Sequence, residues 1–134
     1  MLKKIIKVPL YPNRLGIIIT DSTTINEVYS FLSQQGMTNK FNLECAATIN
    51  GWINSDNGLS YKCDYVILNF SEEELSHGTI THEVIHFINS IFTDIGANID
   101  QHNDEPQAYL AQWATNEIYK FIEESGRKIK SNGG

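Results

Sequence analysis

Three residues in the pattern His-Glu-x-x-His, His82, Glu83 and His86, have the types and spacing needed to bind a metal and use it. Residues four apart on a helix share a face, so the two imidazoles can hold one zinc ion. Glu83 is rotated by about 100° from His82. Its carboxylate would therefore lie beside the metal, where it could take a proton from a zinc-bound water.

The segment around this pattern predicts a helix from about Leu75 or Ser76 to Thr93. Its apolar residues cover most of the helix circumference, which is typical of a helix buried in the middle of a domain. Two histidines and a glutamate buried without partners would be costly. A metal site is therefore favoured over the alternative, in which carbonyl groups satisfy two structural histidines and Glu83 is solvated.

A third ligand has to come from outside this helix. Glu105 opens a second predicted helix, from Pro106 to about Glu124, and His102 and Asp104 lie in the polar loop before it. Antiparallel packing of the two helices would carry Glu105 back toward the histidines, and a helix holds a ligand more rigidly than a loop. Glu105 is therefore the preferred third ligand, with His102 and Asp104 as alternatives. Glu105 or Asp104 could instead simply cap the helix.

His82, Glu83 and His86, followed nineteen residues later by Glu105, resemble the pattern of the gluzincins, zinc metallopeptidases whose third ligand is a glutamate on the following helix. Within this pattern, residues 78–86 and 104–110 are similar to a smaller group, the short metallopeptidase-like proteins of tailed bacteriophages. Residues 8–11 resemble the same group more weakly. The strong resemblance covers residues 78–113. It implies His82, His86 and Glu105 as zinc ligands and Glu83 as the general base.

The chain departs from the gluzincin pattern at Tyr109. Larger members often carry an acidic residue four positions after the glutamate, where it orients a histidine ligand. The Tyr109 hydroxyl could do the same or could stabilise an oxyanion, which makes it a catalytic candidate. The metzincin pattern would need a glycine and a histidine where Asn89 and Phe92 stand, so that class is excluded.

Outside this segment, other residues have simpler interpretations. His77 could contribute to a site, although an exposed position in the first turn of the helix is favoured. Trp52 and Trp113 are expected to line the core or a groove. A strand ending near Trp52 or Leu68 could form a sheet edge beside the metal, where an extended substrate would pair.

The rest of the chain predicts an α+β domain with a small, mostly antiparallel sheet, a minimal zincin-like fold. Residues 2–8 and 14–20 read as strands joined by a turn, and a helix follows from Ile25 to about Gly36. Residues 43–53 and 60–69 read as a hairpin around the turn at 54–58. We expect one domain over residues 1–126 and a flexible tail over residues 127–134.

Composition narrows the function further. The formal net charge of −6 argues against nucleic acid as a partner, because phosphate binding needs a clustered basic face. No stretch approaches the roughly 20 apolar residues of a membrane helix. The basic start reads as a strand of a cytoplasmic protein. Cys45 and Cys63 read as reduced thiols that could form a disulfide only outside a cell.

Together these features predict a zinc metallopeptidase that acts on a peptide or protein substrate in the cytoplasm. If the phage resemblance holds, this is the host cell cytoplasm, or the virion. The alternative is a non-catalytic, zinc-stabilised phage structural or interaction module that binds a phage or host protein. A weaker alternative is a degenerate peptidase that has lost its metal.

Overall fold

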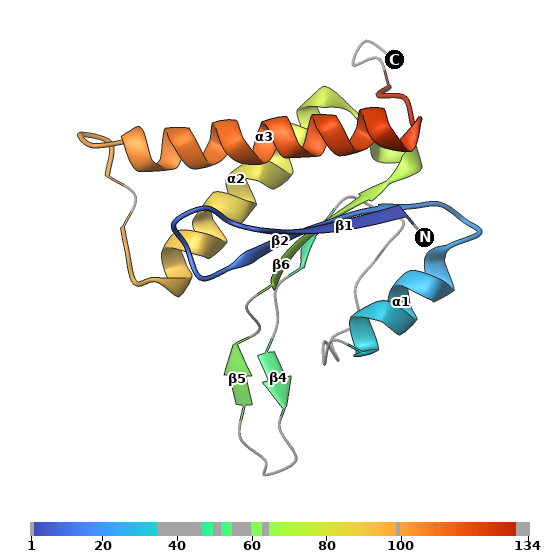
Figure 1. The fold of residues 1–134 in the computed structure, drawn as a ribbon, viewed down its shortest axis with the longest axis horizontal. Helices are drawn as coiled ribbons and strands as arrows, with labels where there is room; N and C mark the ends of the chain where they lie inside the picture. Colours follow the sequence, from blue (N-terminus) through green and yellow to red (C-terminus); the bar gives the residue numbers. More distant parts are fainter. Residues whose placement is uncertain are drawn as a thin grey trace.

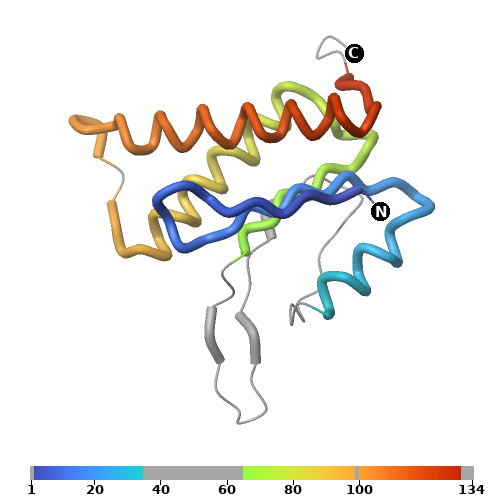
Figure 2. The backbone as a smooth tube through the Cα atoms, viewed as in Figure 1, coloured from blue at the N-terminus to red at the C-terminus, as the bar shows by residue number. Residues whose placement is uncertain are grey.

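The chain forms an α+β domain in which helices cover both faces of a small mixed sheet (Figure 1). The computed structural model describes residues 2–34, 65–98 and 100–130, and the backbone of 47–49, 52–54 and 60–62. Figure 2 traces the path of the backbone. No helix in these ranges is long and apolar enough to cross a membrane. Cys45 and Cys63 lie outside the described residues.

The sheet has four strands in the order β1-β2-β6-β3. These are β1 (Leu2–Lys7), β2 (Arg14–Thr20), β6 (Tyr65–Ser71) and β3 (Ala47–Ile49). The predicted antiparallel pair at the N-terminus is confirmed, with Leu2 opposite Ile19. The predicted hairpin is also confirmed, because β3 pairs antiparallel with β6 and β4 (Trp52–Asn54) with β5 (Ser60–Lys62). The pairing of β2 with β6 is parallel, which the sequence did not indicate.

The two faces of the sheet are covered by different helices (Figure 1). α1 (Ile25–Gln34) covers one face. It buries Val28, Phe31 and Leu32, which are three and four positions apart on one side of the helix. α2 (His77–Asp94) and α3 (Glu105–Ser125) cover the other face. Burying apolar surface in this two-sided core stabilises the fold by about 25 cal/mol per Å².

The main core lies between the sheet and the two long helices. Its strand residues alternate along β2 and β6, and its helix residues recur every three or four positions along α2 and α3. They include Leu15, Ile17, Ile19, Val66, Leu68, Phe70, Ile80, Val84, Phe87, Ile91, Leu110, Ala114 and Ile118. Leu68 belongs to β6, which lies between β2 and β3, so it is in an inner strand rather than at a sheet edge. Among the described strands, β3 is the edge strand that contacts α2.

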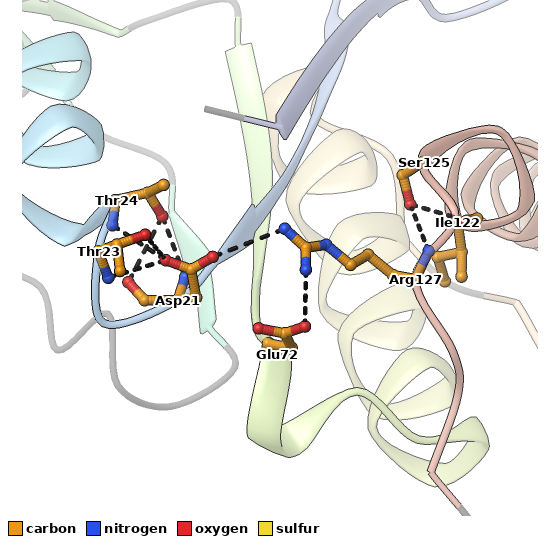
Figure 3. Close-up of polar contacts among 7 residues, drawn as sticks. All are labelled: Asp21, Thr23, Thr24, Glu72, Ile122, Ser125 and Arg127. Carbon is orange, nitrogen blue, oxygen red and sulfur yellow. Dashed lines mark hydrogen bonds and ion pairs between the residues drawn. The ribbon is translucent and has the colours of Figure 1, made fainter.

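Residues 127–130, which the sequence assigned to a tail, lie against the start of α2. The short helix η1 (Glu72–Glu74) separates β6 from α2. The Lys130 amide donates to the Leu75 carbonyl at 2.7 Å. Arg127 Nη1 donates to Glu72 Oε1 at 2.9 Å, and its Nη2 lies 3.6 Å from Asp21 Oδ2 (Figure 3). These contacts join the ends of β2 and β6 to the chain that follows α3.

Asp21 also organises the start of α1. Its Oδ1 accepts hydrogen bonds from the Thr23 hydroxyl at 2.6 Å and from the Thr23 and Thr24 amides (Figure 3). The Thr23 hydroxyl, followed by these amide bonds, lowers the pKa of the Asp21 carboxyl below its ordinary value.

Candidate metal centre

The helix that carries the His-Glu-x-x-His pattern begins where the sequence predicted. Ser76 caps α2, because its hydroxyl accepts a hydrogen bond from the Thr79 amide at 3.2 Å. Residues at helical spacing, Ile80, Val84 and Phe87, pack into the core. The opposite side is open to solvent, and Ile85 there is 54% exposed. The expectation of a helix buried all around is therefore wrong, since α2 has one packed face and one exposed face.

The two histidines of the pattern lie together on the exposed face of α2. Their Nε2 atoms are 3.2 Å apart, and their ring centroids are 4.8 Å apart. Two nitrogens bound to one tetrahedral zinc at their usual distance of about 2.05 Å would lie roughly 3.3 Å apart. The two Nε2 atoms lie within hydrogen-bonding distance of one another, and their separation is close to the one expected for two ligands of a shared zinc ion.

Exposure changes the physical argument for this pair. The His82 side chain is 67% exposed, so water can form hydrogen bonds with its imidazole. No metal is therefore needed to offset a cost of burying it. Of the three residues in the pattern, only Glu83, which is 3% exposed, is buried. The case for a metal therefore rests on the convergence of the two nitrogens and on the carboxylate beside them.

Glu83 lies next to the histidine pair but on the packed side of the helix. Its Oε1 is 3.9 Å from His82 Nε2. This neighbour relationship follows from helix geometry, since adjacent residues differ in direction by about 100°. The buried carboxylate therefore lies close to the His82 end of the histidine pair.

The predicted third ligand is not part of this cluster. Glu105 and its two alternatives, His102 and Asp104, are exposed around the first turn of α3. In the described parts of the chain, no three His, Cys, Asp or Glu side chains form a group that could hold a metal. The spacing of the donor pair on α2 fits zinc, whereas the described residues do not assemble a complete set of protein ligands.

The crossing of α2 and α3 explains this separation. Where α2 begins, His77 stacks on Tyr119 of α3 at a centroid distance of 5.6 Å, and the Tyr119 hydroxyl lies within hydrogen-bonding distance of Nδ1. Burial raises the pKa of Tyr119. Toward the connecting loop the two helices diverge (Figure 1). His77 is exposed in the first turn of α2, as expected, and it contacts Tyr119 rather than the histidine pair.

Tyr109 and Glu105 face a second region instead. They border a cleft of about 440 Å³ between the first half of α3 and the turn that joins β1 to β2. The other lining residues are Pro9, Leu10, Tyr11, Asn103, Pro106, Leu110 and Trp113. Trp113, expected to line a core or groove, lines this cleft and contacts Phe87 at a centroid distance of 6.4 Å. The side chain of Trp52 lies outside the described residues.

Sequence reasoning missed two features of the molecule. One is the cleft itself, although an apolar turn, Pro9, Leu10 and Tyr11, was a visible signal. The other is the contact of Arg127 with Asp21 and Glu72, for which the sequence holds no local signal because the three residues are far apart in the chain.

Comparisons with known proteins leave the site to be judged on its own geometry. No family profile matches this chain, and no curated protein sequence or solved structure shows significant similarity to it.

Proposed function

We propose that this protein is a zinc-dependent hydrolase of peptide bonds in which His82 and His86 hold the metal and Glu83 is the general base. The observation that carries the proposal is the approach of the two Nε2 atoms to 3.2 Å with a Glu83 oxygen 3.9 Å from one of them. Two convergent neutral imidazoles are good zinc ligands, and a neighbouring carboxylate matches the requirements of proton transfer.

Zinc held by His82 and His86 would supply Lewis-acid polarisation of a substrate carbonyl and would lower the pKa of a bound water. Glu83 would act as the general base that accepts a proton and later returns it to the leaving amine. Its burial at 3% exposure restricts its rotamers, so the carboxylate is held in position before the substrate binds. The exposed face of α2 leaves room for a peptide to reach the histidine pair.

Glu105 is the proposed third ligand, and it would have to approach the histidines from the first turn of α3. Two features support such a movement. Asp104 precedes the helix without a side-chain capping bond, and the loop before it is exposed. Segments with few buried contacts open at low free-energy cost. Tyr109, one turn further along α3, would approach with Glu105 as an orienting or oxyanion-stabilising group.

An edge strand supports a peptide as the substrate. β3 contacts α2, and β6 is its only neighbour among the described strands of its sheet. An extended peptide can add to such an edge through main-chain hydrogen bonds. In the non-catalytic alternative, zinc would instead pin α2 to α3. The exposure of His82 supports that alternative less well, since its ring lies away from the helix contact at His77 and Tyr119.

The test compares the zinc-loaded protein with its Glu83→Gln variant on a mixture of unstructured peptides, with products identified by mass spectrometry. Glutamine keeps the size of the side chain but cannot accept the proton. We expect cleavage to fall by about 10²–10⁴-fold while bound zinc and the thermal transition are retained. Equal cleavage by both proteins would rule out Glu83 as the base. No cleavage by either, with zinc bound to both, would favour the non-catalytic alternative.

A further inference from the structure

We propose that the cleft between α3 and the β1–β2 turn binds a peptide segment that carries a bulky apolar side chain next to a basic one. In this structure the cleft lies apart from the histidine pair, although it contains Glu105 and Tyr109, and the inference goes beyond the proposed hydrolysis because it requires no metal. Its volume of about 440 Å³ lies in the range of sites that enclose one large side chain or a small ligand.

The walls of the cleft determine the apolar part of the ligand. Leu10 is fully exposed and Tyr109 is 67% exposed, and Pro9, Pro106 and Trp113 line the same cleft. Neighbouring exposed apolar groups of this kind mark sites that a partner covers. An incoming leucine, methionine or phenylalanine side chain would remove these groups from water together with its own surface.

The conformation of Leu10 is a second, independent sign. Its φ is 67°, and it is the only non-glycine residue with positive φ in the described part of the chain. This left-handed conformation is unfavourable for a branched apolar residue. The Lys7 ammonium donates to the Tyr11 carbonyl at 3.1 Å, and the Val8 amide donates to the Asn13 carbonyl at 3.0 Å, so the turn is tied on both sides. The turn thus holds Leu10 outward at the rim of the cleft.

Charge selects the cationic part of the ligand. Glu105 lines the cleft, and Asp104 comes immediately before Glu105 in the chain. Both residues are exposed. In the described part of the chain no ion pair of Glu105 is found. The chain as a whole carries a net charge of −6, which disfavours a second copy as the occupant. A lysine or arginine beside the apolar residue complements this rim.

The remaining polar group indicates a peptide rather than a simple apolar amine. Asn103 borders the cleft, whose surface is almost entirely apolar, and it lies two residues before Glu105. A carboxamide at the rim both donates and accepts hydrogen bonds, so it can pair with a main-chain amide of an extended segment. Apolar walls, with an amide and a carboxylate at the rim, then correspond to a side chain, a backbone and a neighbouring cation.

The test uses the full chain in EDTA, so that the result does not depend on zinc. The probe is an acetylated, amidated tetrapeptide Gly-Leu-Arg-Ser. Two controls replace its leucine by serine or its arginine by glutamate. Binding is followed in ¹H–¹⁵N spectra through the Trp113 indole and the amides of Leu10 and Glu105. Trp113 is one of two tryptophans, and a Trp52→Phe variant assigns its signal.

We expect the probe to shift the signals of the cleft residues, and each control peptide to bind at least about 10-fold more weakly. Tyr109→Ser should weaken the probe by a similar factor, whereas Tyr29→Ser on α1, also an exposed tyrosine, should not. Glu105→Gln should reduce the preference for arginine over glutamate, and Glu123→Gln at the other end of α3 should leave it unchanged. Absence of shifts, or equal binding of the serine control, would overturn the proposal.

Discussion

The exposed face of α2 and the cleft at the start of α3 differ in how their residues are brought together. His82, Glu83 and His86 lie on one helix, and their relation is fixed by helix geometry alone. Glu105 and Tyr109 meet the β1–β2 turn only through tertiary packing. The sequence predicts a single site for all five residues, whereas this structure divides them between two. A metal-binding motif within one helix is thus more predictable than a ligand that a second helix must deliver.

The largest expected effect is a loss of zinc affinity when either histidine of the pair is replaced, compared with replacement of another histidine. His82→Ala or His86→Ala should lower zinc affinity by at least about 100-fold, because loss of even an outer-shell partner of a metal ligand costs 10–100-fold. His77→Ala is the matched control, since it removes an exposed histidine from the same helix and should leave zinc affinity unchanged. The measurement is competition with a chromogenic zinc chelator. A similar loss in His77→Ala would place the metal elsewhere.

A smaller effect tests whether Glu105 belongs to the cleft alone. If zinc draws the first turn of α3 toward α2, Glu105→Gln should weaken zinc binding by about 10-fold, with His102→Ala and Asp104→Asn closer to the unmodified protein. The same chelator competition measures all three variants. Unchanged affinity in Glu105→Gln would confine this residue to the cleft and leave the third position to another group.

The next comparison concerns the contact between the start of α2 and α3, where His77 stacks on Tyr119. Tyr119→Phe removes the hydrogen bond with His77 but keeps the ring stacked on the imidazole. We expect the free energy of unfolding to fall by about 1 kcal/mol, measured by urea denaturation, with zinc affinity unchanged. A large loss of zinc affinity in this variant would show that the contact at His77 also sets the geometry of the histidine pair.

The smallest effect concerns Asp21, far from both regions. Its lowered pKa means that the ionised form of the Asp21 carboxyl is more stable in the folded protein than in the unfolded chain. The resulting stability is present above the ordinary carboxyl pKa of 3.8 and is lost as the pH falls through the lower folded value. Unfolding curves of the Thr23→Val variant should therefore show a weaker loss of stability with acid than those of the unmodified protein. An identical pH profile would exclude this contribution.

Local features of the fold could be predicted from the sequence because local rules determine them. The extents of the strands β1 and β2, the Ser76 cap of α2 and the left-handed Gly126 after α3 each follow from residues close together in the chain. The parallel pairing of β2 with β6 and the crossing of α2 and α3 depend on packing between distant segments. The predicted burial of His82 and His86 failed for the same reason, since an apolar sequence does not show which helix face remains uncovered.

The most direct test of the account is a long-range ¹H–¹⁵N spectrum of the imidazole nitrogens, recorded while zinc is added. The chain has four histidines, so each ring can be assigned by single substitution. The account predicts that Nε2 of His82 and of His86 shift together and saturate at one zinc per chain, while the rings of His77 and His102 do not change. If the rings of His82 and His86 remain unshifted at saturating zinc, there is no zinc site on α2 and the proposed hydrolase is contradicted.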